Sequence, residues 1–403
     1  MRITHDVAVV GLGAAGSAAV QALARRGLRV LGLDRHAPPH PLGSTHGETR
    51  MIREAYFEAP FYVPLVRRAF DAWADLERRA GRRLLHRTGG IMIGIPDGEL
   101  VTGSLASARR HGVPFEEMDA ARIASRFPAL RPEGRLVGIL EPRAGYLSPE
   151  DCVETCLALA RADGAEIRAG EPVESWSLES GDLRLRTPAG EHRATRVLFC
   201  AGAWTGGLFP ELKLPLVLER SIQYWFAPAA RDDGRVAGAS EGEGEPGGLY
   251  GATRKGNGAE ALRPGRCPVY AWEAEPGRIW YGFPLQPRGV KVGFHHGGET
   301  VDDPGAVRRE VDDSEVRTMR ATLEKYVPSA AGRLREASVC LYTNTPDGHF
   351  LLDRHPDAPG VWIATACSGH GFKFASALGE ILAALVLDED PGFDLTPFRL
   401  ERF

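Results

Sequence analysis

The amino-acid sequence predicts an α/β fold in which a parallel-sheet domain is interleaved with a second, sheet-rich α+β domain. Three observations lead to this prediction. An apolar run near the N-terminus passes through a glycine-rich turn into a helix, and the same order recurs near the C-terminus. Short runs with a β-like pattern lie between these segments. The chain is therefore expected to leave the first domain and return to it.

The N-terminal segment begins with a buried strand over Val7–Val10, and Gly11-x-Gly13-x-x-Gly16 follows at once. In a dinucleotide-binding turn Gly11 permits the tight bend, Gly13 lets the backbone approach a pyrophosphate, and Gly16 lets helix and strand pack closely. A helix is expected over Ala14–Arg25, and its free N–H groups would face the phosphates. This context favours dinucleotide binding over a tight turn without a ligand.

A second strand is expected over Arg29–Leu33 and ends at Asp34. An acid at this position can bind the hydroxyl groups of a ribose, which favours FAD or NAD over NADP. The motif alone does not choose between FAD and NAD. The loop Ala37–Gly47 follows and can pass over a bound nucleotide.

Composition narrows the class of protein. A chain of 403 residues with 43% hydrophobic and 25% charged residues predicts two or so intertwined globular domains. Its net charge of −4 does not favour nucleic acid or anionic membranes as partners, and no apolar run is long enough to span a bilayer. The first strand begins at about Ile3, so a cytoplasmic protein without a signal peptide is expected. The six cysteines form no CxxC pair, and no metal site is expected.

The middle of the chain alternates between the two domains. The pattern predicts a helix over Tyr62–Arg79 and then an excursion into the sheet-rich domain from about Arg87. That excursion contains the runs Gly90–Gly94 and Arg135–Ile139, with a helix over Leu100–His111 between them. A helix over 148–159, strands over 166–168 and 183–187, and a buried strand over 196–201 return the chain to the nucleotide domain.

The second excursion begins at about Ser221. Asp232–Arg266 is rich in glycine and predicts a long flexible loop. Ile279–Pro284 and Val290–His296 then predict paired strands, and a helix is expected over Ser314–Tyr326.

The C-terminal segment repeats the opening architecture. Strands are expected over 336–343, 350–353 and 361–366, and Cys367–Lys373 is expected to open a helix that runs to about Leu387. A helix N-terminus that carries Lys373 would place positive charge beside the cofactor. A reduced flavin carries negative charge near N1 and the C2 carbonyl, so this arrangement favours FAD over NAD.

At these residues the chain resembles the monomeric sarcosine oxidase family, within the D-amino acid oxidase-like superfamily, along nearly its whole length. The resemblance begins with the N-terminal glycine motif and Asp34. It continues in five further segments, which are Ser44–Arg53, Tyr281–Pro284, Lys291–His295, Val339–Thr343 and Gly369–Lys373. Six segments in the same order are far more specific than any one of them.

The resemblance implies a flavoenzyme that oxidises N-methyl and other secondary amino acids with O2. It implies a Rossmann-like FAD-binding domain built from residues 1–85, 148–217 and 330–403. The substrate domain would comprise residues 86–147 and 218–329. A small secondary amino acid and O2 are the expected partners, and a monomer is expected.

The resemblance also implies roles for individual residues. Cys340 would carry the FAD through a thioether to its 8α-methyl group, and Lys291 would be the cation that activates O2. The residues with implied catalytic roles are Lys291, His295, Arg50, Tyr281 and His370. The implied substrate-binding residues are Arg53, Lys373 and Tyr342, of which Arg53 and Lys373 would hold the substrate carboxylate. The implied cofactor-binding residues are Gly11, Gly13, Gly16, Asp34, Ser44, His46, Cys340, Gly369, Gly371 and Lys373.

Several alternatives stay open. Without the resemblance, Cys340 reads as a buried strand cysteine, Lys291 as a solvated strand lysine, and His295 and His370 as structural histidines. Thr45 stands where the family usually has a histidine, and the glycine-rich stretch 232–266 looks like an insertion.

Because of both departures, the sequence does not identify the substrate. Sarcosine is the first expectation, and N-methyl-L-tryptophan, pipecolate or another N-substituted amino acid are alternatives. A flavin-dependent amino acid dehydrogenase, an NAD-linked dehydrogenase and a non-catalytic flavin-binding subunit are the rival classes.

Overall fold

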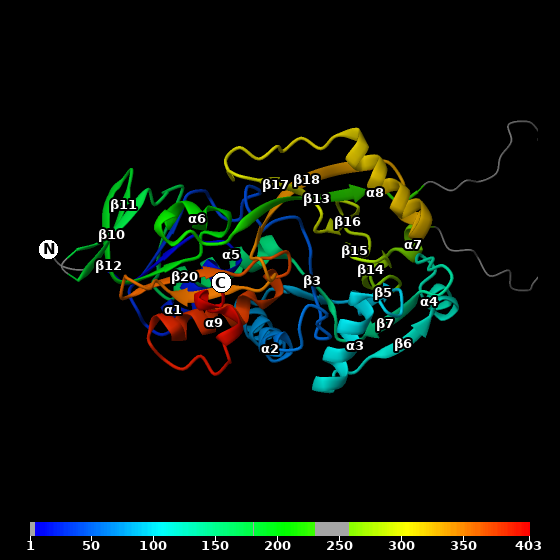
Figure 1. Ribbon diagram of the computed structural model, residues 1–403, viewed down its shortest axis with the longest axis horizontal. Helices are drawn as coiled ribbons and strands as arrows, with labels where there is room; N and C mark the ends of the chain where they lie inside the picture. Colours follow the sequence, from blue (N-terminus) through cyan, green and yellow to red (C-terminus); the bar gives the residue numbers. More distant parts are fainter. Residues whose placement is uncertain (1–4, 180, 230–257) are drawn as a thin grey trace, which may run out of the picture.

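The computed structural model describes residues 5–179, 181–229 and 258–403. It confirms the predicted α/β fold class, since a mostly parallel sheet and a larger, mostly antiparallel sheet lie side by side (Figure 1). The first sheet is assembled from three separate parts of the chain and the second from two. The glycine-rich stretch predicted as a flexible loop lies outside the described residues up to position 257, and Gly258–Ala261 forms a short helix, α7.

The first sheet has eight strands, with β1 paired in parallel to β2 on one side and to β12 on the other. Successive residues of β1 alternate between two cores: Val7 and Val9 face the helices, whereas Ala8 and Val10 face the opposite side. The strands are β1 (His5–Val10), β2 (Val30–Asp34), β9 (Glu166–Ala169), β10 (Ser175–Glu179), β11 (Asp182–Thr187), β12 (Gly190–Phe199), β19 (Leu351–Arg354) and β20 (Val361–Thr365).

Three helices pack against one face of this sheet, α1 (Ala14–Ala24), α5 (Pro149–Ala162) and α9 (Ala375–Val386), and α2 (Tyr62–Ala80) packs on α5 and α9. The helices α1 and α9 approach closely at Gly379, where an added Cβ would lie 2.6 Å from the backbone of Ala18. The predicted helices 14–25, 62–79 and 148–159 are therefore confirmed within a few residues. The remaining short turns are η1 (Gly202–Trp204), α6 (Thr205–Leu208), η2 (Pro210–Leu212), η5 (Thr396–Phe398) and η6 (Leu400–Arg402).

The second sheet has nine strands and joins the two predicted excursions, because β14 pairs in parallel with β5. The predicted paired strands are confirmed as the antiparallel pair β15 and β16. The strands are β5 (Gly90–Gly94), β6 (Glu116–Asp119), β7 (Val137–Glu141), β13 (Val217–Phe226), β14 (Val269–Glu275), β15 (Arg278–Gly282), β16 (Val290–His295), β17 (Glu299–Val301) and β18 (Leu334–Asn344). The helices that accompany it are α3 (Glu99–His111), α4 (Ala120–Arg126), α8 (Asp313–Tyr326) and η3 (Pro328–Ala330).

A third sheet has three strands, of which β3 (Arg50–Ile52) lies between the two large sheets (Figure 1). The other two strands are β8 (Gly145–Leu147) and β4 (Leu85–Arg87). The strand β3 carries Arg50, and Arg53 follows directly after it. This small sheet therefore places both arginines at the junction of the two large sheets.

The helix expected to open at Cys367 begins later, with the single turn η4 (Phe372–Phe374) before α9, because Ser368 and Gly369 adopt positive φ angles that no helix contains. The predicted domain boundaries stay a prediction; β18, from the segment 330–403, pairs with β13 in the nine-stranded sheet. Within the described part of the chain, no helix is long and apolar enough to cross a membrane.

Candidate active site

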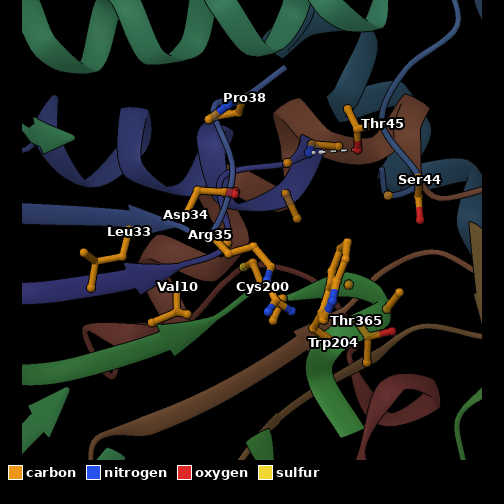
Figure 2. Close-up of a pocket in the computed structure, with 18 of the residues that line it drawn as sticks. Val10, Leu33, Asp34, Arg35, Pro38, Ser44, Thr45, Cys200, Trp204 and Thr365 are labelled. Atoms are coloured by element: carbon orange, nitrogen blue, oxygen red, sulfur yellow. Dashed lines mark hydrogen bonds between the residues drawn. The ribbon is translucent and has the colours of Figure 1, made fainter. Parts of the chain in front are cut away.

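A cavity of about 450 Å³ lies at the carboxyl ends of β1, β2, β12 and β20 (Figure 2). Open parallel sheets bind their ligands at this edge. Gly11, Gly13, Asp34 and Ser44, all predicted to bind the cofactor, line this cavity. We call it the nucleotide cavity.

The glycine turn has the geometry that its predicted role requires. Gly11 has a φ of +91°, which side chains rarely tolerate. An added Cβ on Gly16 would lie 1.8 Å from the carbonyl oxygen of Gly11, so only glycine lets α1 begin here. Ala14 N, at the start of α1, donates to Thr45 Oγ1 at 3.3 Å. The threonine that departs from the family pattern therefore contacts the helix start.

Asp34 is buried at the same edge of the sheet. Its carboxylate accepts hydrogen bonds from Leu12 N at 2.7 Å and His36 N at 2.8 Å. These bonds fix the carboxylate against the nucleotide cavity. Arg35 and Trp204 lie together in this cavity, with the guanidinium 5.1 Å from the ring centre (Figure 2).

A second cavity, of about 140 Å³, shares five lining residues with the first, so the two cavities adjoin. The shared residues are Ala14, Ser44, Thr45, Ala366 and Cys367. We call this second space the substrate-side cavity. The predicted site residues that line it are Arg50, Arg53, Tyr281, Lys291, His295, Cys340, Tyr342, Gly369, His370, Gly371 and Lys373.

The segment of residues 44–58, which we call the bridging segment, forms much of this lining. Lys291 is fully buried, and its Nζ donates to the carbonyl oxygens of Gly47 and Thr49, both at 2.7 Å. The carboxylate of Glu150, in the first turn of α5, accepts from Gly47 N at 2.5 Å and from Glu48 N. Burial lowers the pKa of Lys291 well below its ordinary value, and Arg50 lowers it further.

Arg50 and Cys340 lie beside this ammonium group. Arg50 donates to the carbonyl oxygen of Ser44 at 2.9 Å, and its Nη2 is 3.7 Å from the sulfur of Cys340. Burial raises the pKa of the Cys340 thiol, whereas Arg50 and Lys291 act against that rise. The thiol therefore lies near two cations that favour its thiolate form.

Arg53 is buried and holds an anion of the protein itself. Its Nη2 donates to Glu58 Oε2 at 2.8 Å, and its guanidinium stacks over the rings of Tyr56 and Phe57. Burial alone would raise the pKa of Glu58, but Arg53 and further cations lower it to about 2. A carboxylate is thus stable as an anion in the substrate-side cavity.

Lys373 belongs to a short chain of hydrogen bonds. Its Nζ donates to the carbonyl oxygen of His370 at 2.8 Å and to Tyr56 Oη at 3.2 Å. His370 Nε2 lies 2.9 Å from the Gly348 carbonyl, which can only accept, so His370 Nδ1 accepts from the Tyr56 hydroxyl. Burial lowers the pKa of Lys373 to about 7 and that of His370 to about 4.

Tyr281, Tyr342 and His295 form the remaining wall. Burial raises the pKa of Tyr281 to about 12 and lowers that of His295 well below its ordinary value. An added Cβ on Gly369 would lie within 2.8 Å of the rings of both Tyr342 and His295, so glycine permits this packing. His296 lies outside the lining and contacts Glu219 Oε2 at 3.0 Å.

The structure does not bring every predicted residue to the cavities. His46 is buried outside both linings, and burial lowers its pKa to about 3. Sequence reasoning in turn missed Glu58, Tyr56 and Gln223, which line or support the substrate-side cavity. For Tyr56 and Glu58 the one signal in the sequence was that they follow Arg53 closely along the chain.

The residues present fit FAD. Buried polar atoms without a hydrogen-bond partner among the described residues include Thr365 Oγ1 in the nucleotide cavity and Gln223 Oε1 in the substrate-side cavity. A ligand with polar groups along its whole length would satisfy both. Cationic side chains in the substrate-side cavity suit a flavin ring that gains negative charge on reduction.

Comparisons with known proteins identify the family of this chain. The family model described as DAO, FAD dependent oxidoreductase, matches residues 6–385. The chain is 38% identical to a monomeric sarcosine oxidase of Streptomyces avermitilis, covering 96% of this chain and 94% of that protein. It is 33% identical to an N-methyl-L-tryptophan oxidase of Salmonella agona, covering 99% of each.

Among solved structures, the amino acid oxidase NikD aligns with a TM-score of 0.81 at 24% identity, covering 99% of this chain and 98% of that one. That likeness concerns the fold. The match over residues 6–385 and the 38% identity to a relative covered almost end to end show that the chain belongs to the DAO family of FAD-dependent oxidoreductases.

Proposed function

We propose that this protein is a flavoprotein oxidase of secondary, N-methylated amino acids such as sarcosine. It would produce an imine, which water hydrolyses to amine and aldehyde, and hydrogen peroxide. The observation that carries the proposal is the pair of buried cations, Arg53 and Lys373, in a small cavity that adjoins the nucleotide cavity. Relatives named monomeric sarcosine oxidase and N-methyl-L-tryptophan oxidase support it.

Bound FAD would supply the redox chemistry by accepting a hydride equivalent from the carbon beside the amine nitrogen and passing electrons to O2. Gly11, Gly13, Gly16 and Asp34 would hold its nucleotide half. Ser44, Gly369, Gly371 and Lys373 would lie along its ring system, and His46 would support the same region from outside the cavity lining.

Arg53 and Lys373 would bind the substrate carboxylate. Arg53 already holds the carboxylate of Glu58 in the cavity, which supports the binding of a carboxylate at this position. A charge-assisted contact of this type contributes about 1.5–3 kcal/mol. Tyr281, Tyr342, His295 and His370 would enclose the rest of a small amino acid. The limited volume of about 140 Å³ favours a substrate of that size.

Arg50 and Lys291 would act on the ring side of the site. Lys291 would place a positive charge where electrons pass to O2, since a preorganised cation stabilises negative charge that develops in the transition state. Its pKa is depressed by burial, and an anionic neighbour raises such a pKa again. Cys340 would carry the FAD through a thioether; burial raises the pKa of its thiol, and Arg50 and Lys291 act against that rise.

Rival functions differ in what they need. N-methyl-L-tryptophan, pipecolate or another N-substituted amino acid remain alternative substrates, and a flavin-dependent dehydrogenase remains an alternative reaction. An NAD-linked dehydrogenase disagrees with the FAD-dependent family. A non-catalytic flavin-binding subunit would not need Arg53, Lys291 and Lys373 together. The cytoplasmic location and the monomeric state remain predictions from the sequence.

The first test is a substrate panel. Purified protein should be yellow and should release peroxide in air with at least one of sarcosine, N-methyl-L-tryptophan and L-pipecolate, and the KM should be much higher for the methyl ester of that substrate than for the free acid. Flavin bleaching without peroxide would indicate a dehydrogenase instead. If no secondary amino acid bleaches the flavin under anaerobic conditions, the proposed function is wrong.

The second prediction concerns the flavin link. Acid-precipitated wild-type protein should stay yellow, whereas Cys340→Ser should release its flavin into the supernatant. Cys367→Ser is the matched control, because Cys367 lines the same two cavities. It should keep the flavin attached. Free flavin from the wild-type protein, or release from the Cys367 variant alone, would contradict attachment at Cys340.

The third prediction is a pH dependence of anion binding. Propionate carries a carboxylate but no amine, so between pH 6 and 9 only groups of the protein titrate. Because the pKa of Lys373 is about 7, the cation is present below this pH and lost above it. The dissociation constant, followed by flavin absorbance, should rise about tenfold per pH unit above 7.

The control for this prediction is Lys373→Met. The variant should bind propionate weakly and without this pH dependence. Glu58 and His370, with pKa values of about 2 and about 4, do not change charge in this window. An identical pH profile in wild type and variant would remove Lys373 from the carboxylate site.

A further inference from the structure

Glu141 is a buried carboxylate that the proposed chemistry does not use. It ends β7 of the nine-stranded sheet and is 3% exposed. Glu54 N donates to both of its oxygens, at 2.8 and 2.9 Å, and Ala55 N donates to Oε2 at 2.8 Å. Glu141 does not line the substrate-side cavity. All three hydrogen bonds therefore go to the backbone of the bridging segment.

The same stretch of backbone determines where Arg53 lies. Arg53 Nη1 donates to the carbonyl oxygen of Ala55 at 2.9 Å. Ala55 therefore binds Glu141 through its N–H group and Arg53 through its C=O group. The next residue, Tyr56, stacks against the guanidinium and accepts a hydrogen bond from Lys373. Both cations that would bind the substrate carboxylate are thus tied to the backbone that Glu141 fixes.

Glu54, whose N–H group binds Glu141, is itself held by ion pairs. Glu54 forms ion pairs with Arg67, from α2, and with Arg143. Burial raises the pKa of Glu141, and its bonds from Ala55 N and Glu54 N act against that rise. An ionised carboxylate accepts all three N–H bonds, whereas a neutral amide in its place has a single acceptor oxygen and an NH₂ group facing donors.

We propose that Glu141 is a positioning residue: by holding the backbone of Glu54 and Ala55, it orients Arg53 toward the carboxylate of the substrate. The inference deepens the proposed function and rests on it in one respect, namely that Arg53 binds the substrate carboxylate. A change at Glu141 should therefore act on the recognition of the carboxylate and not on the redox step.

A matched control is present in the same sheet. Glu273, in β14, is 1% exposed and accepts from Leu100 N at 2.8 Å and Gly277 N at 3.0 Å. It is likewise a buried carboxylate that binds backbone N–H groups, but those groups belong to α3 and a hairpin turn. Loss of its charge measures the structural cost of such a change without moving Arg53.

The experiment compares Glu141→Gln with Glu273→Gln as flavin-loaded enzymes, using the best substrate and its methyl ester. Glu141→Gln should raise KM for the acid by roughly tenfold to a hundredfold, as supporting residues do when they misplace a binding group. The KM for the ester and kcat should change less than about threefold. Glu273→Gln should lower Tm to a similar extent and leave the ratio of the two KM values unchanged.

Two further variants separate the possible failures. Arg53→Ala should remove the discrimination between acid and ester; if it does not, the proposed anchor itself is wrong. If Arg53→Ala removes the discrimination but Glu141→Gln changes the KM values for acid and ester equally, only the role of Glu141 is overturned. Should Glu141→Gln fail to fold, Glu141→Asp, which keeps the charge but is one methylene shorter, must still shift the acid-to-ester ratio, or the inference falls.

Discussion

The site depends on the burial of one ammonium group, that of Lys291. A buried charge needs polar partners, and Lys291 finds them in the carbonyl oxygens of Gly47 and Thr49. Two carbonyls can point at one nitrogen only if the bridging segment keeps a bent course, with its N–H groups directed elsewhere. Glu150 and Glu141 accept those N–H groups at two points along the segment. Charged groups on three other elements, of which Lys291 and Glu141 are buried, thus define the path of residues 44–58.

This segment also connects the two halves of the molecule. Lys291 comes from β16 and Glu141 from β7, both in the nine-stranded sheet, whereas Glu150 comes from α5, which packs on the nucleotide-binding sheet. The cavity at the junction collects the cations of Arg50, Arg53, Lys291 and Lys373 against the carboxylate of Glu58, which is 14% exposed. Such an excess of positive charge suits a site that must hold a substrate carboxylate beside a cofactor that becomes anionic on reduction.

Much of the fold was predictable because its signals are local. The glycine turn and Asp34 depend on neighbours within one βαβ unit, and the structure places them together at one sheet edge. The start of α9 was not predictable, because the positive φ angles at Ser368 and Gly369 have no clear signal in the sequence. That residues far apart in the sequence, such as Arg53 and Lys373, meet at one site was predicted only from the family resemblance. Glu141 escaped notice altogether, because its partners lie 86 and 87 positions away.

The most direct test separates two roles of Lys291, namely its hydrogen bonds to the bridging segment and its positive charge beside the site where O2 reacts. Lys291→Gln keeps N–H donors for Gly47 and Thr49 but removes the charge, whereas Lys291→Met removes both. Stopped-flow absorbance of the flavin times the anaerobic reduction by substrate and the reoxidation by O2 independently. We expect Lys291→Gln to slow reoxidation by roughly 10²–10³-fold while reduction stays near the wild-type rate. Equal slowing of both half-reactions, or reoxidation at the wild-type rate, would contradict the role of this buried charge.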